Sequence, residues 1–172
     1  MKKKLLIALC SLAVIFTACR KPVDPTPTPE PVDYTSNYVG NYVGQFTLTI
    51  TSMNNQPQSN MTFPIDGIGM DIAKGTEDNA ITATVTVESE THQTQGTATA
   101  DKADFETVRL VIDKPDQFYK FNLDLKMEGT KAESDTLNIV GSFSGDGDAT
   151  IMGQEQIFNE VSGTLTGKLV KH

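Results

Sequence analysis

One cysteine has the clearest chemistry in this sequence. Cys19 ends the tetrapeptide Phe-Thr-Ala-Cys of residues 16–19, which follows a lysine-rich start at residues 2–4 and an apolar run over residues 5–16. A charged start, a short apolar segment and small residues before the cleavage point are typical of a secretory signal. The thiol after the cleavage point is the nucleophile that accepts diacylglycerol. The pattern predicts a bacterial lipoprotein with a signal peptide over residues 1–18 and a lipid attached to Cys19.

Two other interpretations of this segment stay open. The apolar run could be a transmembrane helix, although about a dozen residues fall short of the ~20 needed to span a bilayer. An ordinary secretory signal could instead be cleaved near Ala18, with Cys19 merely nearby. In the lipoprotein interpretation Cys10 leaves with the signal peptide, and the mature chain keeps one acylated cysteine. That chain would have no disulfide, no thiol nucleophile and no cysteine-bound metal.

The histidines offer little for catalysis. His92 lies in a polar stretch and His172 is the last residue, so no histidine pair is spaced to hold zinc. A Ser-His-Asp triad around His92 stays open, but residues 141–145 (Gly-Ser-Phe-Ser-Gly) have their serines at the wrong offsets for a nucleophile elbow. The default expectation is a solvated surface histidine.

Pairs of carboxylates are the other candidate groups for chemistry. They are Glu88 with Glu90, Asp101 with Asp104, and Asp146 with Asp148. Glycosidase chemistry needs two carboxyl groups across a cleft, one with a pKa raised by burial. These pairs are expected at solvated turns, so we predict no catalytic residues and no cofactor. Asp146 and Asp148 are weak candidates for calcium, since two carboxylates supply too few of the six or more oxygens that the ion needs.

The segment after the cysteine is expected to be a spacer. Residues 19–33 hold five of the eight prolines, at alternating or near-alternating positions, which favours extended polyproline II. At ~3.1 Å per residue, such a spacer would hold a domain on the order of 40 Å from the membrane. A docking motif for a proline-binding domain is the alternative. Removal of the signal peptide leaves 11 basic against 22 acidic side chains, which argues against nucleic-acid binding.

Residues 34–172 are expected to form one all-β domain. Alternation with a period of two is present almost throughout, as in residues 42–50 and 119–128. Its parity shifts by one at Gly67, which predicts a bulge or a barrel corner. Residues 91–100 read as a weak or edge strand, and 145–148 as a loop that closes a strand. Eight or nine antiparallel strands that are joined by short hairpin turns and have polar outer faces predict a small up-and-down β-barrel. A two-sheet β-sandwich is the alternative.

Several of these features together resemble a known family. The acylated cysteine, the proline-rich spacer, the strand of residues 38–44 and the closing Gly-Thr-Leu-Thr-Gly of residues 163–167 are similar to the calycin-like, or lipocalin-like, β-barrel lipoproteins of Bacteroidetes. The resemblance implies a small barrel, in a family mostly without assigned function. The chain lacks the Gly-x-Trp of true lipocalins and any tryptophan, so no ligand-pocket residue carries over. Asp135-Thr136-Leu137 is similar to O-glycosylation sites of these bacteria, which would make Thr136 an acceptor; a plain entry into a strand is the other interpretation.

The expected function is that of a non-enzymatic outer-membrane lipoprotein, anchored by the lipid on Cys19, whose barrel binds a partner protein or a small apolar ligand at one open end. The inward aromatic residues favour a mostly filled barrel, which would leave binding to loops at 54–60, 74–79, 129–135 and 144–148. A carboxylate-based hydrolase or isomerase and a structural or adhesive subunit of a surface complex are the alternatives. The basic Arg20-Lys21 favours the periplasmic face of the outer membrane over the cell surface.

Overall fold

The computed structural model describes residues 30–172, except 115–118, 134 and 152. The chain divides into Met1–Pro31 and Val32–His172. The whole sheet and the buried core described below belong to the second unit, which therefore contains what it needs to fold alone. The predicted signal peptide, Cys19 and most of the predicted spacer lie outside the described residues.

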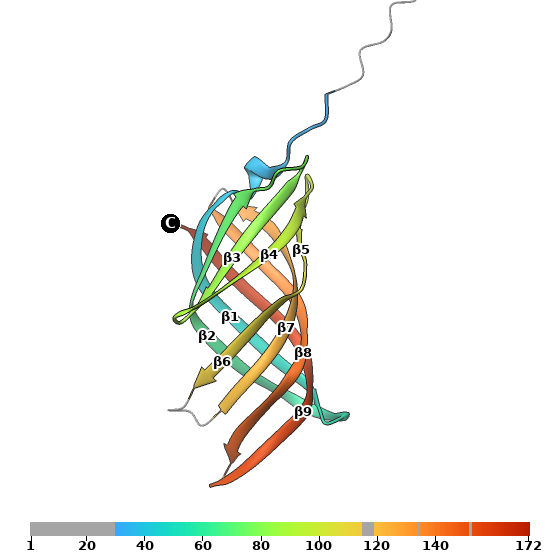
Figure 1. Cartoon of the computed structure of the whole chain (residues 1–172), viewed down its shortest axis with the longest axis vertical. Coiled ribbons are helices and arrows are strands. Elements are labelled where there is room, and N and C mark those ends of the chain that lie inside the picture. The colour runs from blue at the N-terminus through green and yellow to red at the C-terminus, as the bar shows by residue number, and fades with distance from the viewer. Residues whose placement is uncertain (1–29, 115–118, 134, 152) are drawn as a thin grey trace, which may run out of the picture. The chain divides into compact units, whose positions relative to one another are not determined.

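A single antiparallel sheet of nine strands closes into a ring (Figure 1). A 3-10 turn, η1 (Thr35–Asn37), precedes the strands β1 (Gly40–Met53), β2 (Gln56–Lys74), β3 (Ala80–Val87), β4 (Glu90–Ala98), β5 (Ala103–Phe105), β6 (Val108–Lys114), β7 (Tyr119–Glu133), β8 (Thr136–Ile151) and β9 (Gln154–Lys171). Neighbours in sequence pair with each other, β1 pairs with β9, and β5 bridges β4 and β7 to complete the ring. Since β5 and β6 both pair with β7, they act as two halves of one strand in an eight-stranded barrel.

The all-β barrel predicted from the alternation is confirmed. Strand β3 shows the pattern most clearly, since every second residue from Ile81 to Val87 is buried inside the ring. The β1–β9 and β5–β7 pairings join all the strands into one closed sheet, which excludes the two-sheet sandwich. The prediction of a weak edge strand also holds, because β4 pairs with β3 along its length but with β5 only from Gly96 to Ala98.

Three phenylalanines inside the barrel each lie directly across the ladder from a glycine. The pairs are Phe46 with Gly167, Phe143 with Gly163, and Phe121 with Gly147. A Cβ atom on these glycines would lie 2.5, 2.7 and 2.2 Å from the nearest ring carbon, respectively. The glycines therefore leave the space that the aromatic rings fill, and each ring covers a position that has no side chain of its own.

The bulge predicted at Gly67 is present. In the β1–β2 ladder Phe46 pairs with Ile65 and Gly44 with Ile68, so two β2 residues oppose Gln45 alone. Gly67 has a φ of 70°, in the left-handed region that glycine adopts without a steric cost. The extra residue accounts for the parity shift in the sequence and keeps apolar residues inward on both sides of it.

The predicted loop at 145–148 is wrong. These residues lie within β8, which continues to Ile151, and a register shift against β9 falls between Gly145 and Gly147. The glycines allow the neighbouring strands to approach closely, because a Cβ on Gly145 would lie 1.9 Å from the carbonyl oxygen of Asn122. Two other loops were also predicted too long, because β7 runs to Glu133 and β2 already begins at Gln56.

Candidate functional site

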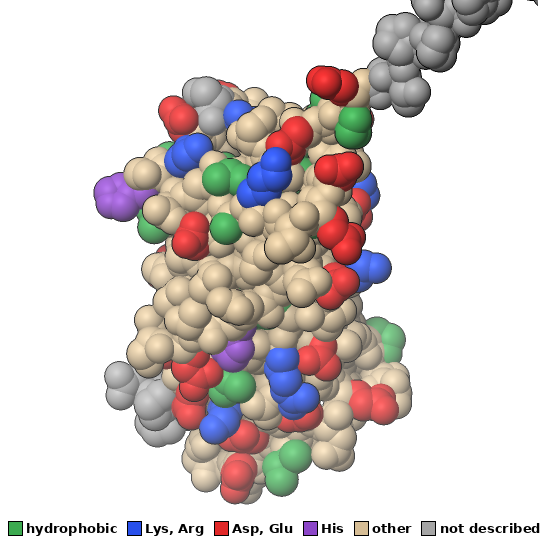
Figure 2. All heavy atoms as spheres, turned by 45° about the horizontal axis from the view of Figure 1, so that its top comes forward, with side chains coloured by type: hydrophobic (Ala, Val, Ile, Leu, Met, Phe, Trp, Pro, Cys, Tyr) green, Lys and Arg blue, Asp and Glu red, His purple; other side chains and the backbone are tan. Residues whose placement is uncertain are grey.

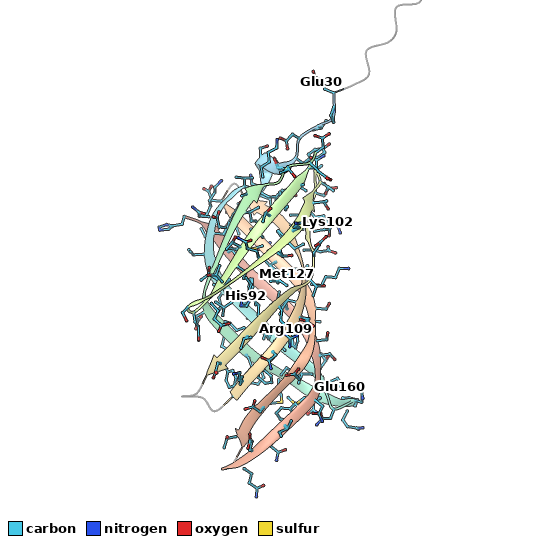
Figure 3. All side chains as sticks on the ribbon, in the orientation of Figure 1. Glu30, His92, Lys102, Arg109, Met127 and Glu160 are labelled. Carbon is cyan, nitrogen blue, oxygen red and sulfur yellow. The ribbon has the colours of Figure 1, made fainter. Side chains whose placement is uncertain are left out.

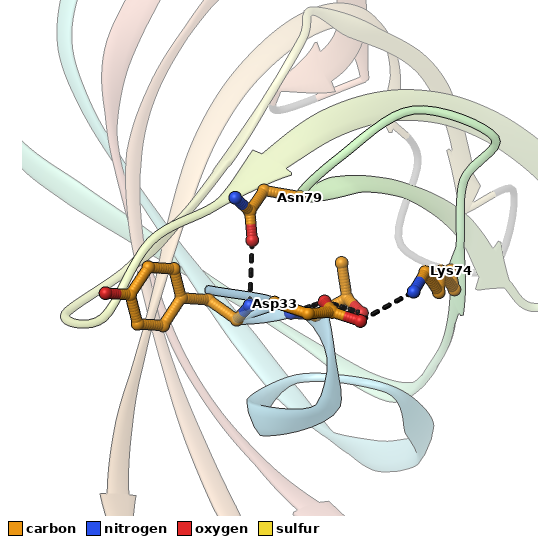
Figure 4. A network of polar contacts seen from close by, with 5 residues as sticks. Asp33, Lys74 and Asn79 are labelled. Atoms are coloured by element: carbon orange, nitrogen blue, oxygen red, sulfur yellow. Dashed lines mark hydrogen bonds and ion pairs between the residues drawn. The ribbon is translucent and has the colours of Figure 1, made fainter. Parts of the chain in front are cut away.

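One end of the barrel is closed by the residues that enter it. Tyr38, just after η1, is buried in the core, and the Tyr42 hydroxyl donates to its carbonyl oxygen at 2.9 Å. The backbone N–H of Tyr34 donates to Asn79 Oδ1 at 2.7 Å, which ties the segment to the β2–β3 connection (Figure 4). These contacts fix the start of the domain over this end of the ring.

Asp33 strengthens the same closure through polar contacts (Figure 4). Its Oδ2 lies 2.5 Å from Lys74 Nζ, and its Oδ1 accepts hydrogen bonds from the Thr35 hydroxyl at 2.6 Å and the Thr35 N–H at 2.9 Å. The hydrogen bond from Lys74, followed by those from Thr35, lowers the pKa of Asp33 to about 2, and the same pair raises the pKa of Lys74. The pattern of contacts is that of a structural clamp at the chain entry.

The opposite end of the barrel is open because one hairpin is short. Strand β3 pairs with β2 only from Gly69 to Lys74, whereas β1 pairs with β2 as far as Gln56. Below the β3–β4 turn, the first half of β2 is therefore unpaired on the edge away from β1, and β6 is unpaired on the edge away from β7, among the described residues (Figure 1). The lower half of the barrel is a curved sheet with an open side.

The ring separates at one identifiable place. Pairing between β4 and the next strand ends with the bond from Glu106 N to Gln95 O at 2.7 Å. The hydroxyl of buried Thr94 donates to the Glu106 carbonyl at 2.8 Å. At this point a side-chain hydrogen bond therefore replaces the backbone hydrogen bonds of the ladder. Beyond this point β4 has no ladder with β6 among the described residues. Glu106 and Thr107 are the break between the two half-strands β5 and β6.

An apolar cavity of about 480 Å³ occupies the open end. Its floor includes Phe63 from β2 and Tyr119 and Phe121 from β7. The Phe63 ring lies edge-on to the other two, with ring centroids 5.6 Å and 6.0 Å away. Met53 and Phe158, at the ends of β1 and β9 nearest the opening, complete the apolar wall. Ligand pockets span about 300–1,000 Å³, so this cavity suits one small molecule.

The rim of the cavity is polar and uncharged. It carries the carboxamides of Asn54, Gln56 and Gln58 from the β1–β2 hairpin, together with Thr150. Asn54 Oδ1 accepts a hydrogen bond from Asn159 N at 2.9 Å, which holds the hairpin against β9. Both turn residues, Asn54 and Asn55, have positive φ, which suits a two-residue hairpin and projects the following glutamines at the opening.

The expectation of a mostly filled barrel is correct away from the cavity. Phe46, Leu110 and Leu125, which do not line it, are fully buried. At the open end the aromatic side chains line a cavity without filling it, and Phe63 and Tyr119 stay half-buried. Of the segments expected to bind, 54–60 reaches the cavity through Asn54, Gln56 and Gln58. Segment 74–79 lies at the closed end, and the cavity lining contains no residue of 129–135 or 144–148.

A second hollow, of about 560 Å³, lies near the junction of β4 and β5. Its lining includes the charged side chains of Glu77, Asp104, Glu106 and Lys126. Solvent hydrates such a surface well, and it lacks the aromatic floor of the cavity at the open end. The apolar cavity is therefore the stronger candidate for a binding site.

The weak calcium candidates do not form a metal site. Asp146 lies exposed on the outer face of β8 and accepts a hydrogen bond from Asn122 Nδ2 at 2.7 Å, while Asp148 is half-buried two residues further along the strand. Among residues 30–172, outside the gaps given above, no three His, Cys, Asp or Glu side chains gather as a metal would need. Calcium requires more oxygens than these two residues offer.

The weak glycosylation candidate is buried. Thr136 is 8% exposed and begins β8, where it pairs with Val170 of β9. A hydroxyl that is glycosylated must be reached by an enzyme, so the folded domain favours the other interpretation of this tripeptide, the entry into a strand.

His92 is not the solvated surface histidine that was expected. Its side chain is 24% exposed and its Nε2, which is buried, lies 3.5 Å from Glu90 Oε2, too far for a hydrogen bond. It shares the inner face of the sheet with its partner Val85, close to where β4 and β6 separate (Figure 3). His172 is exposed at the end of the chain.

The candidate carboxylate pairs face solvent. Every described Asp and Glu side chain is exposed or half-buried, and acidic and basic groups intermingle on the face in Figure 2. Asp104 bonds to Lys102 at 2.8 Å, and Lys102 also contacts Glu128 at 3.2 Å (Figure 3). These contacts lie on the outer surface of the sheet, away from the cavity.

The sequence placed Gln56 and Gln58 in an expected binding loop, but it did not identify Met53 and Phe158 as cavity residues. A signal existed for Phe158, since residues 154–158 place two apolar residues among glutamines and a glutamate just before the strand that was recognised. No family model matches the chain, and no curated protein matches it. Within the described residues, no helix has the length and apolar character to cross a membrane.

Proposed function

We propose that this chain is an outer-membrane lipoprotein, anchored through Cys19, whose barrel is a non-enzymatic receptor for a small apolar ligand. The observation that carries the proposal is the cavity of about 480 Å³ with an aromatic floor at the open end of the barrel. Apolar walls with a few polar groups at one side are the usual composition of a small-molecule site. The fold of the calycin-like lipoproteins that the sequence resembles suits this function.

The position of the cavity also supports the proposal. The spacer joins the domain at Asp33, which is clamped to Lys74 and Thr35 at the closed end. The cavity opens at the other ends of the same strands. A ligand, or a partner protein that delivers it, would therefore approach the end of the barrel opposite the Asp33 clamp.

The alternatives have less support. A carboxylate-based hydrolase or isomerase needs an acid whose pKa is raised by burial, and the described carboxylates are exposed or half-buried. An adhesive subunit would need a large apolar patch. The exposed large hydrophobic side chains of the described residues are mostly scattered, with Val43 and Val170 the pair in register on β1 and β9.

Binding of a fluorescent apolar probe tests the proposed receptor function. N-phenyl-1-naphthylamine is added to the 32–172 domain, and its emission is followed with and without the substitution Ala149→Phe. Ala149 lines the cavity and is half-buried, so a phenyl group there fills the site without removing a core contact. We expect a weaker signal for Ala149→Phe, while the control Ala73→Phe, at an exposed residue of β2, keeps the signal. Equal signals from both variants would reject the cavity as the site.

Metabolic labelling with palmitate tests the anchor. We expect the wild type and Cys10→Ala to carry label and to sediment with the outer membrane, and Cys19→Ala to lose both properties. Label on Cys19→Ala would contradict the lipoprotein assignment. Protease treatment of intact cells then distinguishes the faces of the membrane. Arg20-Lys21 favours the periplasmic face, so we expect protection.

A further inference from the structure

The cavity lining lacks charged side chains. Among the described residues around it there is no Asp, Glu, Lys, Arg or His. One neighbouring charge is used elsewhere: Lys120, next to Tyr119, lies 3.3 Å from Asp113 in an ion pair between β6 and β7. In a domain where acidic and basic groups cover the surface, an uncharged mouth restricts what can bind.

An ionised head group would be poorly accommodated here. A carboxylate that leaves water without a cationic partner pays a large desolvation cost. The net charge of the chain, −8 with the signal peptide and more negative without it, adds repulsion of anions over a longer range. A fatty acid could place its tail on the aromatic floor, but its head would meet no cation among the described side chains of the lining.

The rim instead suits a neutral head group. A carboxamide offers two N–H donors and a carbonyl acceptor, so it can pair with a hydroxyl or an amide of a ligand. The carboxamide of Gln56 makes no hydrogen bond within the described part of the chain, and Gln58 Nε2 has one long bond of 3.3 Å to the Gln56 carbonyl. Both glutamines therefore retain hydrogen-bonding groups for a ligand at the opening.

We propose that the cavity selects an uncharged amphiphile, with an apolar tail on Phe63, Tyr119 and Phe121 and a hydroxyl or amide head at Gln56 and Gln58, over the carboxylate with the same tail. This inference rests on the proposed function. It adds the chemical class of the ligand, which the apolar floor alone does not specify.

A series of ligands with one tail and three heads tests the inference. Decanol, decanoate and decylamine compete with N-phenyl-1-naphthylamine for the 32–172 domain at pH 7.4, below their micelle concentrations. We expect decanol to bind at least about ten-fold more tightly than decanoate. Equal affinity for the two, or tightest binding of decylamine, would overturn the inference and leave the receptor function standing. If none of the three displaces the probe, the receptor function itself fails.

A charge introduced at the rim should reverse the preference. In Gln58→Lys we expect the affinity for decanoate to rise about ten-fold relative to that for decanol, because the new ammonium group pairs with the carboxylate. Gln93→Lys is the matched control, since Gln93 is exposed on β4 outside the cavity lining and the change adds the same charge. An equal gain in both variants would show a general charge effect and would overturn the placement of the head group.

Discussion

Phe46 and Gly167 face each other across the β1–β9 ladder, and a Cβ on Gly167 would lie 2.5 Å from Cδ1 of the Phe46 ring. The ring is fully buried and cannot move aside into solvent. The same arrangement recurs at Phe143 with Gly163. The glycines of the closing Gly-Thr-Leu-Thr-Gly segment are therefore required by the aromatic core that they adjoin.

Gly167→Ala should destabilise the domain by about 1–3 kcal/mol, because the added methyl group overpacks the core beside Phe46. Gly69→Ala is the matched control. Gly69 is also a β-strand glycine, and its Cβ would meet only Thr86, at an ordinary 3.5 Å. We expect this control to stay within about 0.5 kcal/mol of the wild type. Urea unfolding followed by circular dichroism measures both, and equal midpoints for the two variants would contradict the packing role of Gly167.

The barrel could be predicted from the sequence because its main signal is local. Alternation records which residues face inward, and it is a local signal that β3 preserves from Ile81 to Val87. The bulge at Gly67 is local as well, because the extra residue shifts the parity of its own strand. The reason for the glycines was not local, since Phe46 and Gly167 are far apart in sequence and meet only in the ring.

The bulge at Gly67 gives a second prediction, which concerns backbone conformation alone. Gly67 has a φ of 70°, and a Cβ there would meet nothing within 4 Å. Gly67→Ala should therefore cost about 1–2 kcal/mol through the left-handed backbone, with no steric clash. Gly67→Asn should cost less, since asparagine adopts this conformation more readily. Thermal unfolding of the two variants measures the difference, and an alanine variant more stable than the asparagine variant would reject the backbone explanation.

The cavity could not be predicted in the same way. It exists because the β3–β4 hairpin stops at Gly69 of β2, and the relative lengths of distant hairpins are not encoded in any short segment. A register shift between Ile50 and Ser52 of β1 also changes which residues of early β2 face inward, so simple alternation cannot place Gln56 and Gln58. Residues 145–148 were predicted to be a loop because their Gly-Asp composition is typical of a turn. The glycine at 145 is instead required by the close approach of the Asn122 backbone on the neighbouring strand.

The clamp at Asp33 predicts a dependence of stability on pH. The folded-state pKa of Asp33, about 2, is below its ordinary value of 3.8, so the stabilisation is present above 3.8 and is lost as the pH falls from about 4 to 2. Asp33→Asn should lower the melting temperature at pH 7, and its difference from the wild type should disappear near pH 2. Asp71→Asn, at an exposed carboxylate of β2, is the control and should follow the wild type. A constant difference between Asp33→Asn and the wild type at all pH values would contradict the role of the ionised carboxylate.

The last prediction concerns the hydrogen bond of Thr94, which helps to hold the ring closed between β4 and β5. Its hydroxyl is the last link between β4 and the broken strand, and its side chain is 5% exposed. Thr94→Val keeps the shape of the side chain but removes this hydrogen bond to the carbonyl of the exposed Glu106, at a cost of about 0.5–1.5 kcal/mol. The neighbouring bond from Glu106 N to Gln95 O should then open more often, so the Glu106 amide should exchange its hydrogen faster, while amides of the β1–β9 ladder should change only with global stability. Thr97→Val, at an exposed residue of the same strand, is the control. Unchanged exchange at Glu106 in Thr94→Val would show that the backbone pairing of β4 with β5 closes the barrel without the hydroxyl.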